Sequence, residues 1–392
     1  MLKVGLFNDS FPPTIDGVAN TVYNYASIMS GRFCEPVVIT PKYPNVVDNY
    51  TFDVYRYDSA KLTKSMPYRV GNPFSPITLH DIYKKDLDIL HVHCPLASSV
   101  LAKQVSVLYK NRIPTILTYH TKFDIDIDNY VKNKRFNYIA RKFVASNIHQ
   151  ADEIWTVSKG TLDSLRFFGY QGDVVIMPNG TDFEKGKAKP EDIAEIDRIY
   201  RTENEELVLL YCGRMNWYKN IKITLDALKI LVSAGIKFKM FFVGEGPDRP
   251  AIEAYAKQLG ISDYTIFCGA VYDREKVRAF FSRANLFLFP STYDTSGLVV
   301  KEAAACSCAS VLIKGSCAAE GVEDGISGIL ADEENAESFA KAILSAINTP
   351  DLLTTIGKGA ADKVYLSWFD SVRLASKRYE YVAENFNRKK KK

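Results

Sequence analysis

Short apolar segments alternate with helical stretches along the whole chain, and this alternation restricts the possible folds more than any other feature. In the first half, six segments have the length and composition of buried strands: 2–7, 36–40, 89–92, 115–119, 153–157 and 174–177. Helical patterns occupy residues between them: 18–30, 97–110 and 131–149. Apolar strands separated by helices are typical of a doubly wound, mostly parallel α/β sheet. The first half therefore predicts one Rossmann-like domain.

The same alternation returns in the second half and predicts a second domain. Its strand-like segments are 207–211, 239–243, 265–268, 286–289 and 310–313. A chain of 392 residues is also too long for one ordinary core. Residues 183–206 are rich in Lys, Glu and Asp and lack strand character, so they are interpreted as a linker. We thus expect domains at 1–182 and 207–368, with a last segment, 369–392, whose helix packs back on the first domain before a basic tail.

Composition places the chain among soluble globular proteins. Hydrophobic residues make up 47% of the chain and charged residues 24%. No apolar segment approaches the roughly 18 residues of a membrane-spanning helix, and the segment at residues 2–7 is too short for a signal-peptide core. The seven cysteines are an odd number and lie mostly in strand- or helix-like segments, which favours reduced thiols. We therefore expect a cytoplasmic protein.

Residues 289–302 form the most informative segment of the chain. They lead from an apolar strand through a polar turn into a helix, and Asp294 and Glu302 stand eight residues apart around the helix start. That start is expected at Ser296, Gly297 and Leu298. Backbone N–H groups at a helix N-terminus favour phosphate, and each carboxylate could bind a pair of sugar hydroxyls. The segment fits a diphosphate with a sugar on either side, although a plain strand–turn–helix with two solvated acids fits it equally well.

A second segment, residues 207–220, supplies two cations after another apolar strand. The strand ends in Gly213 and Arg214, and Lys219 follows five residues later. Open α/β sheets bind ligands at the edge where the strands end. Arginine can bind phosphate through two parallel hydrogen bonds, and lysine adds a compact positive charge. Taken alone, two such cations in a loop are more often simply solvated.

Taken together, these motifs resemble glycosyltransferase family 4, a family of retaining sugar transferases with the GT-B fold. That family has Gly-Arg-x4-Lys, then Gly-x-Gly-Pro, then Glu-x7-Glu ahead of an Ala-rich helix. This chain has the first motif at residues 213–219, the second at 244–247 and the third, with Asp294 in place of the first Glu, at 294–302. Ser307 also stands where the family usually has Gly. The match covers essentially the whole chain and implies two Rossmann-like domains that face each other across a cleft.

The resemblance implies transfer of a hexose, with retained configuration, from a nucleotide diphosphate sugar such as UDP-glucose or UDP-galactose. Arg214, Lys219 and backbone amides near Gly297 would stabilise the leaving diphosphate, the kind of prearranged electrostatics that usually dominates such sites. Glu302 would bind the nucleotide ribose and Asp294 the transferred sugar. The donor-binding residues implied are Gly17, Gly213, Arg214, Lys219, Asp294, Ser296, Gly297, Leu298 and Glu302. The catalytic residues implied are His120, Asp294, Arg214 and Lys219.

The first domain is expected to carry the acceptor side of the reaction. Gly17 lies in a loop after the first strand, where family members have a flexible glycine loop, and glycine permits close backbone approach to a ligand. His120 follows a strand in the sequence Tyr-His-Thr-Lys-Phe-Asp, and the family places this histidine near the anomeric carbon. No carboxylate nucleophile stands out in this domain. Its absence fits the same-face route proposed for the family, in which the departing phosphate helps to deprotonate the acceptor.

The sequence gives little reason to expect a metal or other cofactor. His91 and His93 are spaced for one face of a strand, but no third ligand accompanies them. Three acids at residues 124, 126 and 128 alternate in an expected loop after His120 and are interpreted as acceptor-facing or solvated. No Asp-x-Asp occurs where a donor metal would be bound. We therefore expect activity without a metal.

The acceptor is indicated by residues 131–150, which hold five cations and no acid, with apolar residues at helical spacing. Either this is a domain helix whose apolar face packs in the core, or it is a basic amphipathic helix that lies on an anionic bilayer. The segment and its lead-in at 118–124 resemble bacterial diacylglycerol glucosyltransferases of the family. A membrane lipid such as diacylglycerol is therefore the favoured acceptor, with the protein peripheral at the inner face of the membrane. The basic tail, Arg388–Lys392, would add attraction to anionic lipid.

Three other functions remain open. The acceptor of the sugar could be soluble or a cell-surface polysaccharide, the chain could be a nucleotide-sugar epimerase of the same fold, or it could bind nucleotide sugars without catalysis. Nucleic acid is not expected as a partner. Without the five-residue tail the chain has 45 basic and 46 acidic residues, so its net charge of +4 is not spread over the fold.

Overall fold

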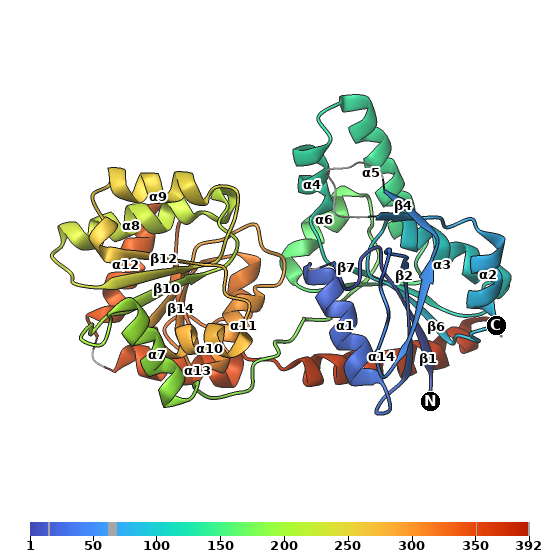
Figure 1. Cartoon of the computed structure of the whole chain (residues 1–392). Coiled ribbons are helices and arrows are strands. Elements are labelled where there is room, and N and C mark those ends of the chain that lie inside the picture. Colours follow the sequence, from blue (N-terminus) through green and yellow to red (C-terminus); the bar gives the residue numbers. More distant parts are fainter. Residues whose placement is uncertain (15, 62–68, 350, 391–392) are drawn as a thin grey trace. The chain divides into compact units, whose positions relative to one another are not determined.

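The computed structural model describes residues 1–14, 16–61, 69–349 and 351–390, and the chain folds into two compact units. Unit 1 comprises Met1–Asn179 and Trp368–Lys392, and unit 2 comprises Gly180–Ser367. Figure 1 shows each unit as a sheet with helices packed around it.

Unit 1 is built on seven parallel strands in the order β3-β2-β1-β6-β7-β8-β9. These strands are β1 (Lys3–Phe7), β2 (Glu35–Pro41), β3 (Asp53–Tyr57), β6 (Ile89–Val92), β7 (Thr115–Tyr119), β8 (Glu153–Thr156) and β9 (Val174–Ile176), with a separate antiparallel pair, β4 (Ser59–Lys61) and β5 (Arg69–Gly71). The helices of this unit are α1 (Gly17–Met29), α2 (Pro76–Tyr83), α3 (Ala97–Leu108), α4 (Phe123–Tyr130), α5 (Lys134–Ile148), α6 (Leu162–Phe167) and α14 (Trp368–Lys390). The inner strands are buried and almost entirely apolar, as expected where helices cover both faces of a parallel sheet.

The two faces of β6 differ in character because successive side chains point to opposite faces of a sheet. Leu90 and Val92 join the apolar core that also contains residues of α3. His91 lies on the other face, where its ring packs against Tyr25 of α1 and Tyr379 of α14. This alternation places a buried polar side chain of β6 on one face of the sheet and apolar side chains on the other.

Unit 2 is built on six parallel strands in the order β12-β11-β10-β13-β14-β15. The strands are β10 (Val208–Cys212), β11 (Lys239–Val243), β12 (Thr265–Gly269), β13 (Leu286–Phe289), β14 (Ala309–Ile313) and β15 (Ile329–Ala331). The helices are α7 (Pro190–Tyr200), α8 (Ile221–Ser233), α9 (Arg249–Gln258), α10 (Arg274–Arg283), α11 (Leu298–Ala305), α12 (Ala336–Ile347) and α13 (Leu352–Lys363). Its core includes Tyr211, Phe241, Phe281 and Phe287, all fully buried. The alternation in the sequence thus predicted both parallel sheets.

The structure differs from the sequence-based boundaries at residues 183–206, which were expected to form a linker. This segment contains α7 and belongs to unit 2. The ring of Tyr200 packs against that of Phe280 of α10, with 5.7 Å between the ring centres, and Asp197 pairs with Arg283 at 2.6 Å. The segment is rich in charged residues because α7 is a surface helix with only a narrow buried stripe, and such a pattern is easily mistaken for a linker.

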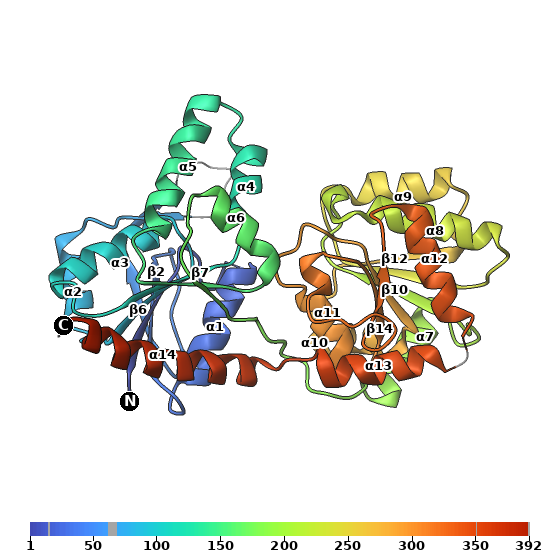
Figure 2. The same ribbon diagram turned by 180° about the vertical axis from the view of Figure 1, so that it is seen from behind.

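The final helix, α14, belongs to unit 1 and packs against α1. Figure 2 shows it, in red, along the lower side of that unit. Its Arg378 pairs with Glu153 of β8, and its Tyr379 hydroxyl lies 2.5 Å from His91 Nδ1. The basic tail, Arg388–Lys392, ends outside the described residues. Over the described part of the chain, no helix is both long enough and apolar enough to span a bilayer.

Candidate functional site

Two glycine turns meet at the carboxyl edge of the sheet in unit 2. The turn after β10 begins at Gly213, and the turn after β11 begins at Gly244. A Cβ atom on Gly244 would lie 2.0 Å from the carbonyl oxygen of Gly213, and one on Gly246 would lie 2.3 Å from that of Met215. Met215 N–H also donates to the Glu245 carbonyl oxygen at 2.9 Å. The glycines of the Gly-x-Gly motif are therefore needed for the backbones of the two turns to approach this closely. This contact fixes the loop that carries Arg214.

The two cations of this loop lie in different environments. Lys219 Nζ donates to Asp294 Oδ1 at 2.5 Å and lies 5.7 Å from the centre of the Phe289 ring, with its side chain only 14% exposed. The second carboxylate oxygen of Asp294 accepts a hydrogen bond from Ser291. Arg214 is exposed, and its side chain has no hydrogen bond or ion pair with any described residue. Lys219 thus orients a carboxylate, while the Arg214 guanidinium remains available to an anion.

Helix α11 begins where the sequence predicted a helix start, at Leu298. Gly297 precedes it with φ of 54°, and a Cβ atom there would lie 2.9 Å from Ala318 Cα, so both conformation and space require glycine. No side chain caps this N-terminus. The buried Ser296 Oγ likewise has no hydrogen-bond partner among the described residues. The first N–H groups of α11 are therefore open to an acceptor from a ligand.

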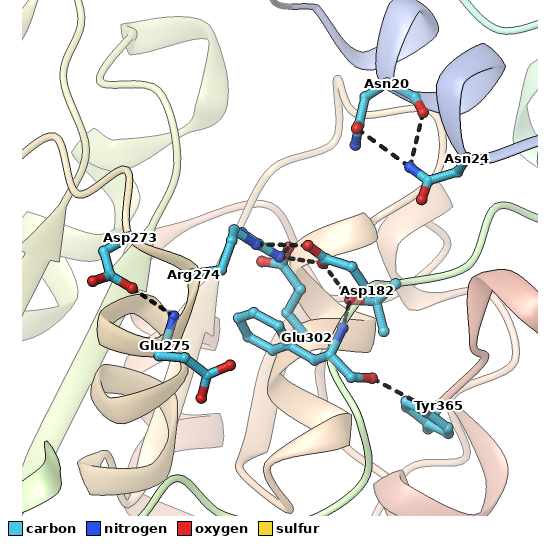
Figure 3. A network of polar contacts seen from close by, with 10 residues as sticks. Asn20, Asn24, Asp182, Asp273, Arg274, Glu275, Glu302 and Tyr365 are labelled. Carbon is cyan, nitrogen blue, oxygen red and sulfur yellow. Dashed lines mark hydrogen bonds and ion pairs between the residues drawn. The ribbon is translucent and has the colours of Figure 1, made fainter. Parts of the chain in front are cut away.

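Glu302, in the middle of α11, belongs to a charged triad shown in Figure 3. Arg274, the first residue of α10, donates from Nη2 to Glu302 Oε1 at 2.5 Å. The same guanidinium donates to both carboxylate oxygens of Asp182, at 2.9 and 2.5 Å, and lies 4.4 Å from the centre of the Phe183 ring. Burial raises the pKa of Glu302, whose side chain is 14% exposed, and the Arg274 guanidinium opposes that rise.

His120 is buried in unit 1 at the carboxyl end of β7, next to a second histidine. Its Nε2 lies 3.1 Å from Nδ1 of His93, and the two rings are stacked. Burial lowers the pKa of His120 to about 3, so the imidazole is neutral at physiological pH. His91 is held by Thr118 and Tyr379, at 2.6 and 2.5 Å. Within the described ranges, no group of three or more His, Cys, Asp or Glu side chains is arranged to hold a metal ion.

Gly17 is the first residue of α1 and is exposed. The preceding Asp16 caps the helix by accepting hydrogen bonds from the N–H groups of Val18 and Ala19, at 2.9 and 2.7 Å. A Cβ atom on Gly17 would meet no atom of the described residues within 4 Å. The fold of unit 1 does not itself require glycine here, so any requirement comes from a ligand.

The alternating acids after His120 lie in helix α4, and the sequence-based prediction of a loop was wrong. Asp124 accepts a hydrogen bond from Ser164, whereas Asp128 accepts one from Asn137 of α5 at 2.8 Å and pairs with Arg141. Residues two apart point to different sides of an α-helix. Asp126 therefore points away from Asp124 and Asp128, which share one face of α4 but are bound to different neighbours.

Helix α5 carries apolar side chains that the rest of unit 1 does not cover. Figure 1 shows α4 and α5 side by side, projecting beyond the sheet of unit 1. Near the end of α5, Val144 and Ile148 are buried. Earlier in the helix, Phe136, Ile139 and Phe143 are 64%, 53% and 42% exposed. Their spacing places them on one face of the helix. The sequence allowed either a core face or a bilayer face, and the structure shows a face that is only partly packed.

The exposed Lys142 and the half-buried Arg141 of α5 each lie close to an exposed aromatic ring. Lys142 Nζ is 5.6 Å from the centre of the Tyr138 ring, and Arg141 lies 4.8 Å from that of Phe167 on α6. Lys134 and Arg135 at the start of the helix are also exposed. Aromatic rings beside lysine and arginine, on a helix without acids, are typical of a helix that lies at a bilayer surface.

The structure thus brings some of the predicted site residues together and separates others by unit. Lys219 and Asp294 are in direct contact, and eight of the ten predicted residues belong to unit 2. Gly17 and His120 belong to unit 1. Sequence reasoning missed Arg274 and Asp182, because partners 28 and 92 residues away from Arg274 leave no local spacing signal.

Two family models match this chain, one in each half. The model described as Glycosyltransferase Family 4 matches residues 15–185, and the model described as Glycosyl transferases group 1 matches residues 192–363. The chain is 26% identical over 372 residues to alpha-monoglucosyldiacylglycerol synthase from Acholeplasma laidlawii, with 92% of each protein covered. It is 25% identical over 399 residues to the synthase of the same name from Streptococcus pneumoniae, with 99% of this chain and 84% of the relative covered.

Solved structures share the fold over almost the whole chain. Alr3699/HepE from Anabaena, in complex with UDP, matches with a TM-score of 0.74 at 18% identity and covers 98% of this chain and 100% of its own. Sucrose-phosphate synthase from Thermosynechococcus elongatus matches with a TM-score of 0.74 at 18% identity, covering 97% and 99%. At such identities the likeness concerns the fold alone.

Proposed function

Because this chain belongs to glycosyltransferase family 4 and has the GT-B fold, we propose that it is a retaining hexosyltransferase with a lipid acceptor. The donor is a nucleotide diphosphate sugar, UDP-glucose or UDP-galactose, and the acceptor is a membrane lipid such as diacylglycerol. The single observation that carries the lipid acceptor is the exposed aromatic and basic surface of α5. The donor rests on the charged groups at the carboxyl edge of unit 2.

In the proposed reaction, positive groups of unit 2 stabilise the diphosphate as it leaves the sugar. Arg214 is exposed without a partner in the described part of the chain, and it binds phosphate oxygens bidentately. The uncapped N–H groups at the start of α11, beside Gly297 and Leu298, add partial positive charge. Lys219 contributes its charge while it orients Asp294. These groups are in place before the substrate binds, so little free energy is lost in reorganising them.

The two carboxylates of unit 2 have separate roles in this proposal. Asp294 has its oxygens directed by Lys219 and Ser291 and accepts hydrogen bonds from hydroxyls of the transferred hexose. Glu302 accepts hydrogen bonds from the ribose of the nucleotide. Gly213 and Ser296 complete the donor site, since a glycine admits close approach and the buried Ser296 hydroxyl is unused within the described residues.

Within unit 1, His120 acts near the anomeric carbon as a neutral imidazole. Burial keeps it uncharged, so it supplies a hydrogen bond to a sugar hydroxyl and does not stabilise the leaving group as a cation. His93 restrains the ring of His120 through its Nδ1. Gly17 takes part in the same reaction, because its uncrowded backbone leaves room for the donor.

The proposed lipid acceptor is supported both by the surface of α5 and by the names of the two relatives. Phe136, Ile139 and Phe143 bury apolar area when they enter a bilayer surface, and neighbouring cations are attracted to anionic headgroups by about 1 kcal/mol each. The relatives from Acholeplasma laidlawii and Streptococcus pneumoniae are named for glucosyl transfer to diacylglycerol. The enzyme thus works at the inner face of the membrane as a peripheral protein.

Product analysis tests this function. The full chain is incubated with a panel of nucleotide sugars and with diacylglycerol in anionic vesicles or soluble sugars in buffer, and products are identified by mass spectrometry. We expect a hexosyl lipid, and its NMR spectrum is expected to show the anomeric configuration of the donor. Hexosyl products from soluble sugars only would contradict the lipid acceptor, and an inverted product would contradict the retaining mechanism.

A soluble or polysaccharide acceptor is the second candidate, favoured only if α5 serves some purpose other than lipid contact. An epimerase needs no acceptor, so acceptor-dependent release of UDP separates the two activities. Metal independence also belongs to the proposal, because Arg214, Lys219 and the start of α11 supply the charge that a divalent cation would otherwise provide.

A further inference from the structure

Arg274 connects the candidate ribose-binding carboxylate to the rest of unit 2. Its guanidinium donates from Nη2 to Glu302 Oε1 at 2.5 Å and from Nε and Nη2 to Asp182 at 2.9 and 2.5 Å. A planar guanidinium presents its donors in a fixed fork, so two carboxylates bound to it are held at a fixed angle to one another. Figure 3 shows Asp182 and Glu302 meeting at this guanidinium.

The arrangement leaves one oxygen of Glu302 for a ligand. Oε1 is occupied by Arg274, whereas Oε2 accepts no hydrogen bond from any residue that the structure describes. The side chain is only 14% exposed, so a ligand can approach the carboxylate from few directions, and the orientation of the carboxylate decides which oxygen the ligand meets. The orientation that Arg274 sets therefore decides whether Glu302 can bind a hydroxyl.

The anchor beneath Arg274 is itself well held. The guanidinium lies over the Phe183 ring, 4.4 Å from its centre. Phe183 N–H donates to Thr181 Oγ1 at 3.2 Å, and its carbonyl oxygen accepts a hydrogen bond from the Tyr365 hydroxyl at 3.0 Å. Asp182 lies between Thr181 and Phe183 in the chain, and these neighbours restrain its backbone. Its carboxylate is therefore held in position to bind Arg274.

We propose that Arg274, fixed by Asp182, is a positioning residue that holds Glu302 ionised and in one orientation, with Oε2 presented to the ribose hydroxyls of the donor. This inference rests on the proposed function, which assigns the ribose to Glu302. It adds two residues, 92 positions apart, to the machinery of nucleotide recognition. Neither belongs to the sequence motifs of the donor site.

The electrostatics of the triad give the proposal a pH signature. The charged or titratable groups around Glu302 are Arg274, Asp182 and the thiols of Cys212 and Cys306. Burial raises the pKa of Glu302, the guanidinium lowers it, and the Asp182 carboxylate raises it. Without Arg274, the remaining influences all favour the protonated acid. As the pH is lowered, Glu302 should become protonated at a higher pH in a variant without this arginine than in the wild type. Nucleotide binding by that variant should therefore begin to weaken at a higher pH.

The test compares binding of UDP and of 2′,3′-dideoxy-UDP to the full chain by isothermal titration calorimetry, between pH 5.5 and 8. GDP and its dideoxy analogue replace them if the wild type prefers that base. The variants are Arg274→Gln, Glu302→Gln and the double variant. Lys276→Gln is the matched control, because Lys276 lies on the same helix and pairs with the exposed Glu195 at 3.3 Å.

We expect Arg274→Gln to bind UDP about 10- to 100-fold more weakly, the range for loss of one hydrogen bond to a charged group. Its affinity for the dideoxy nucleotide should change little, because the ribose hydroxyls are missing from that probe. The double variant should bind UDP no more weakly than Glu302→Gln. Arg274→Lys, which keeps the charge but not the fork, should fall between wild type and Arg274→Gln, and it provides the test if the glutamine variant does not fold.

Equal losses for UDP and dideoxy-UDP would show that Arg274 contacts the nucleotide directly or only braces the fold, and either result overturns the proposal. So does wild-type affinity of Arg274→Gln or Arg274→Lys for UDP. If Glu302→Gln itself binds UDP like the wild type, the ribose assignment in the proposed function fails. If Glu302→Gln loses affinity and Arg274→Gln does not, only the positioning role fails.

Discussion

In unit 2, the candidate site carboxylates Asp294 and Glu302 each contact a cation, whereas unit 1 keeps its buried histidines neutral and leaves apolar side chains in solvent. Lys219 contacts Asp294, and Arg274 contacts Glu302. In unit 1, His120 is buried without a charged partner, and Phe136 on α5 is 64% exposed. A doubly charged donor requires fixed counter-charges, while a lipid acceptor requires an apolar surface. The two units are built from the same alternation of strands and helices, so this difference in chemistry reflects their side chains and not their topology.

The largest effect is expected from removing a fixed charge of unit 2. Lys219→Ala deletes a cation that contacts Asp294 and that, in the proposed function, also neutralises the diphosphate. Loss of a charged contact costs about 1.5–3 kcal/mol, so kcat/KM should fall about 10- to 100-fold. Lys222→Ala is the matched control, because Lys222 pairs with Asp226 on the surface of α8. Steady-state kinetics with UDP-glucose measure the difference, and a normal kcat/KM for Lys219→Ala would remove Lys219 from the site.

A smaller effect is expected from reducing the apolar surface of unit 1. Phe136→Ala combined with Phe143→Ala should lower the binding of the protein to anionic vesicles about tenfold. The loss is modest because a ring at a bilayer surface buries less apolar area than a ring in a protein core. The two side chains are 64% and 42% exposed in the folded chain, so thermal stability should change little.

The control for this pair is Phe74→Ala, a comparably exposed phenylalanine elsewhere in unit 1. Co-sedimentation with vesicles at low salt measures binding for all variants. Unchanged sedimentation of the double variant would show that α5 does not contact lipid.

A still smaller effect concerns pH, and it follows from the burial of His120. Burial lowers the pKa of His120 to about 3, below the value of about 6.5 in an unfolded chain. The stability that His120 contributes is therefore complete above pH 6.5 and is lost as the pH falls towards 3. Between about pH 6.5 and 5.5 the loss amounts to about 1 kcal/mol.

Urea unfolding of wild type and His120→Gln at these two pH values measures this contribution, with the exposed His149→Gln as control. We expect the stability of His120→Gln to depend less on pH than that of the wild type. An unaltered dependence would mean that folding does not lower the pKa of His120.

No effect at all is expected from removing divalent metal ions. In the proposed function, Arg214, Lys219 and the start of α11 neutralise the charge of the diphosphate, so activity should persist in excess EDTA. A complete loss of activity, restored by magnesium or manganese, would point instead to the acids of α4 or to another acidic site.

Particular elements show which parts of the molecule the sequence could predict. The start of α11 and the buried strands before Gly213 and Asp294 could be predicted from local patterns, because a short apolar segment followed by turn residues indicates a strand and its end. Strands β3 and β15 escaped prediction, since the first is only half-buried and the second has three residues. The acids of α4 were assigned to a loop, because alternating Asp residues are poor helix formers when taken alone.

Contacts between residues that lie far apart along the chain could not be predicted from the sequence. Nothing in the spacing of Asp182, Arg274 and Glu302 indicates that they meet, because the pairing depends on how α10 and α11 pack in unit 2. Likewise, the helical spacing of α5 is the same whether its apolar face is covered or exposed. Only the packing of unit 1 shows that Phe136 and Phe143 are left uncovered.

The central claim is that unit 2 binds the donor and the face of α5 in unit 1 contacts lipid. The most direct test measures UDP affinity and vesicle binding in the same preparations of Lys219→Ala and of Phe136→Ala with Phe143→Ala. We expect the lysine variant to lose UDP affinity about tenfold or more and to sediment with anionic vesicles like the wild type. The phenylalanine variant should show the reverse. Loss of both activities in either variant, or a wild-type protein that ignores anionic vesicles even at low salt, would contradict the claim.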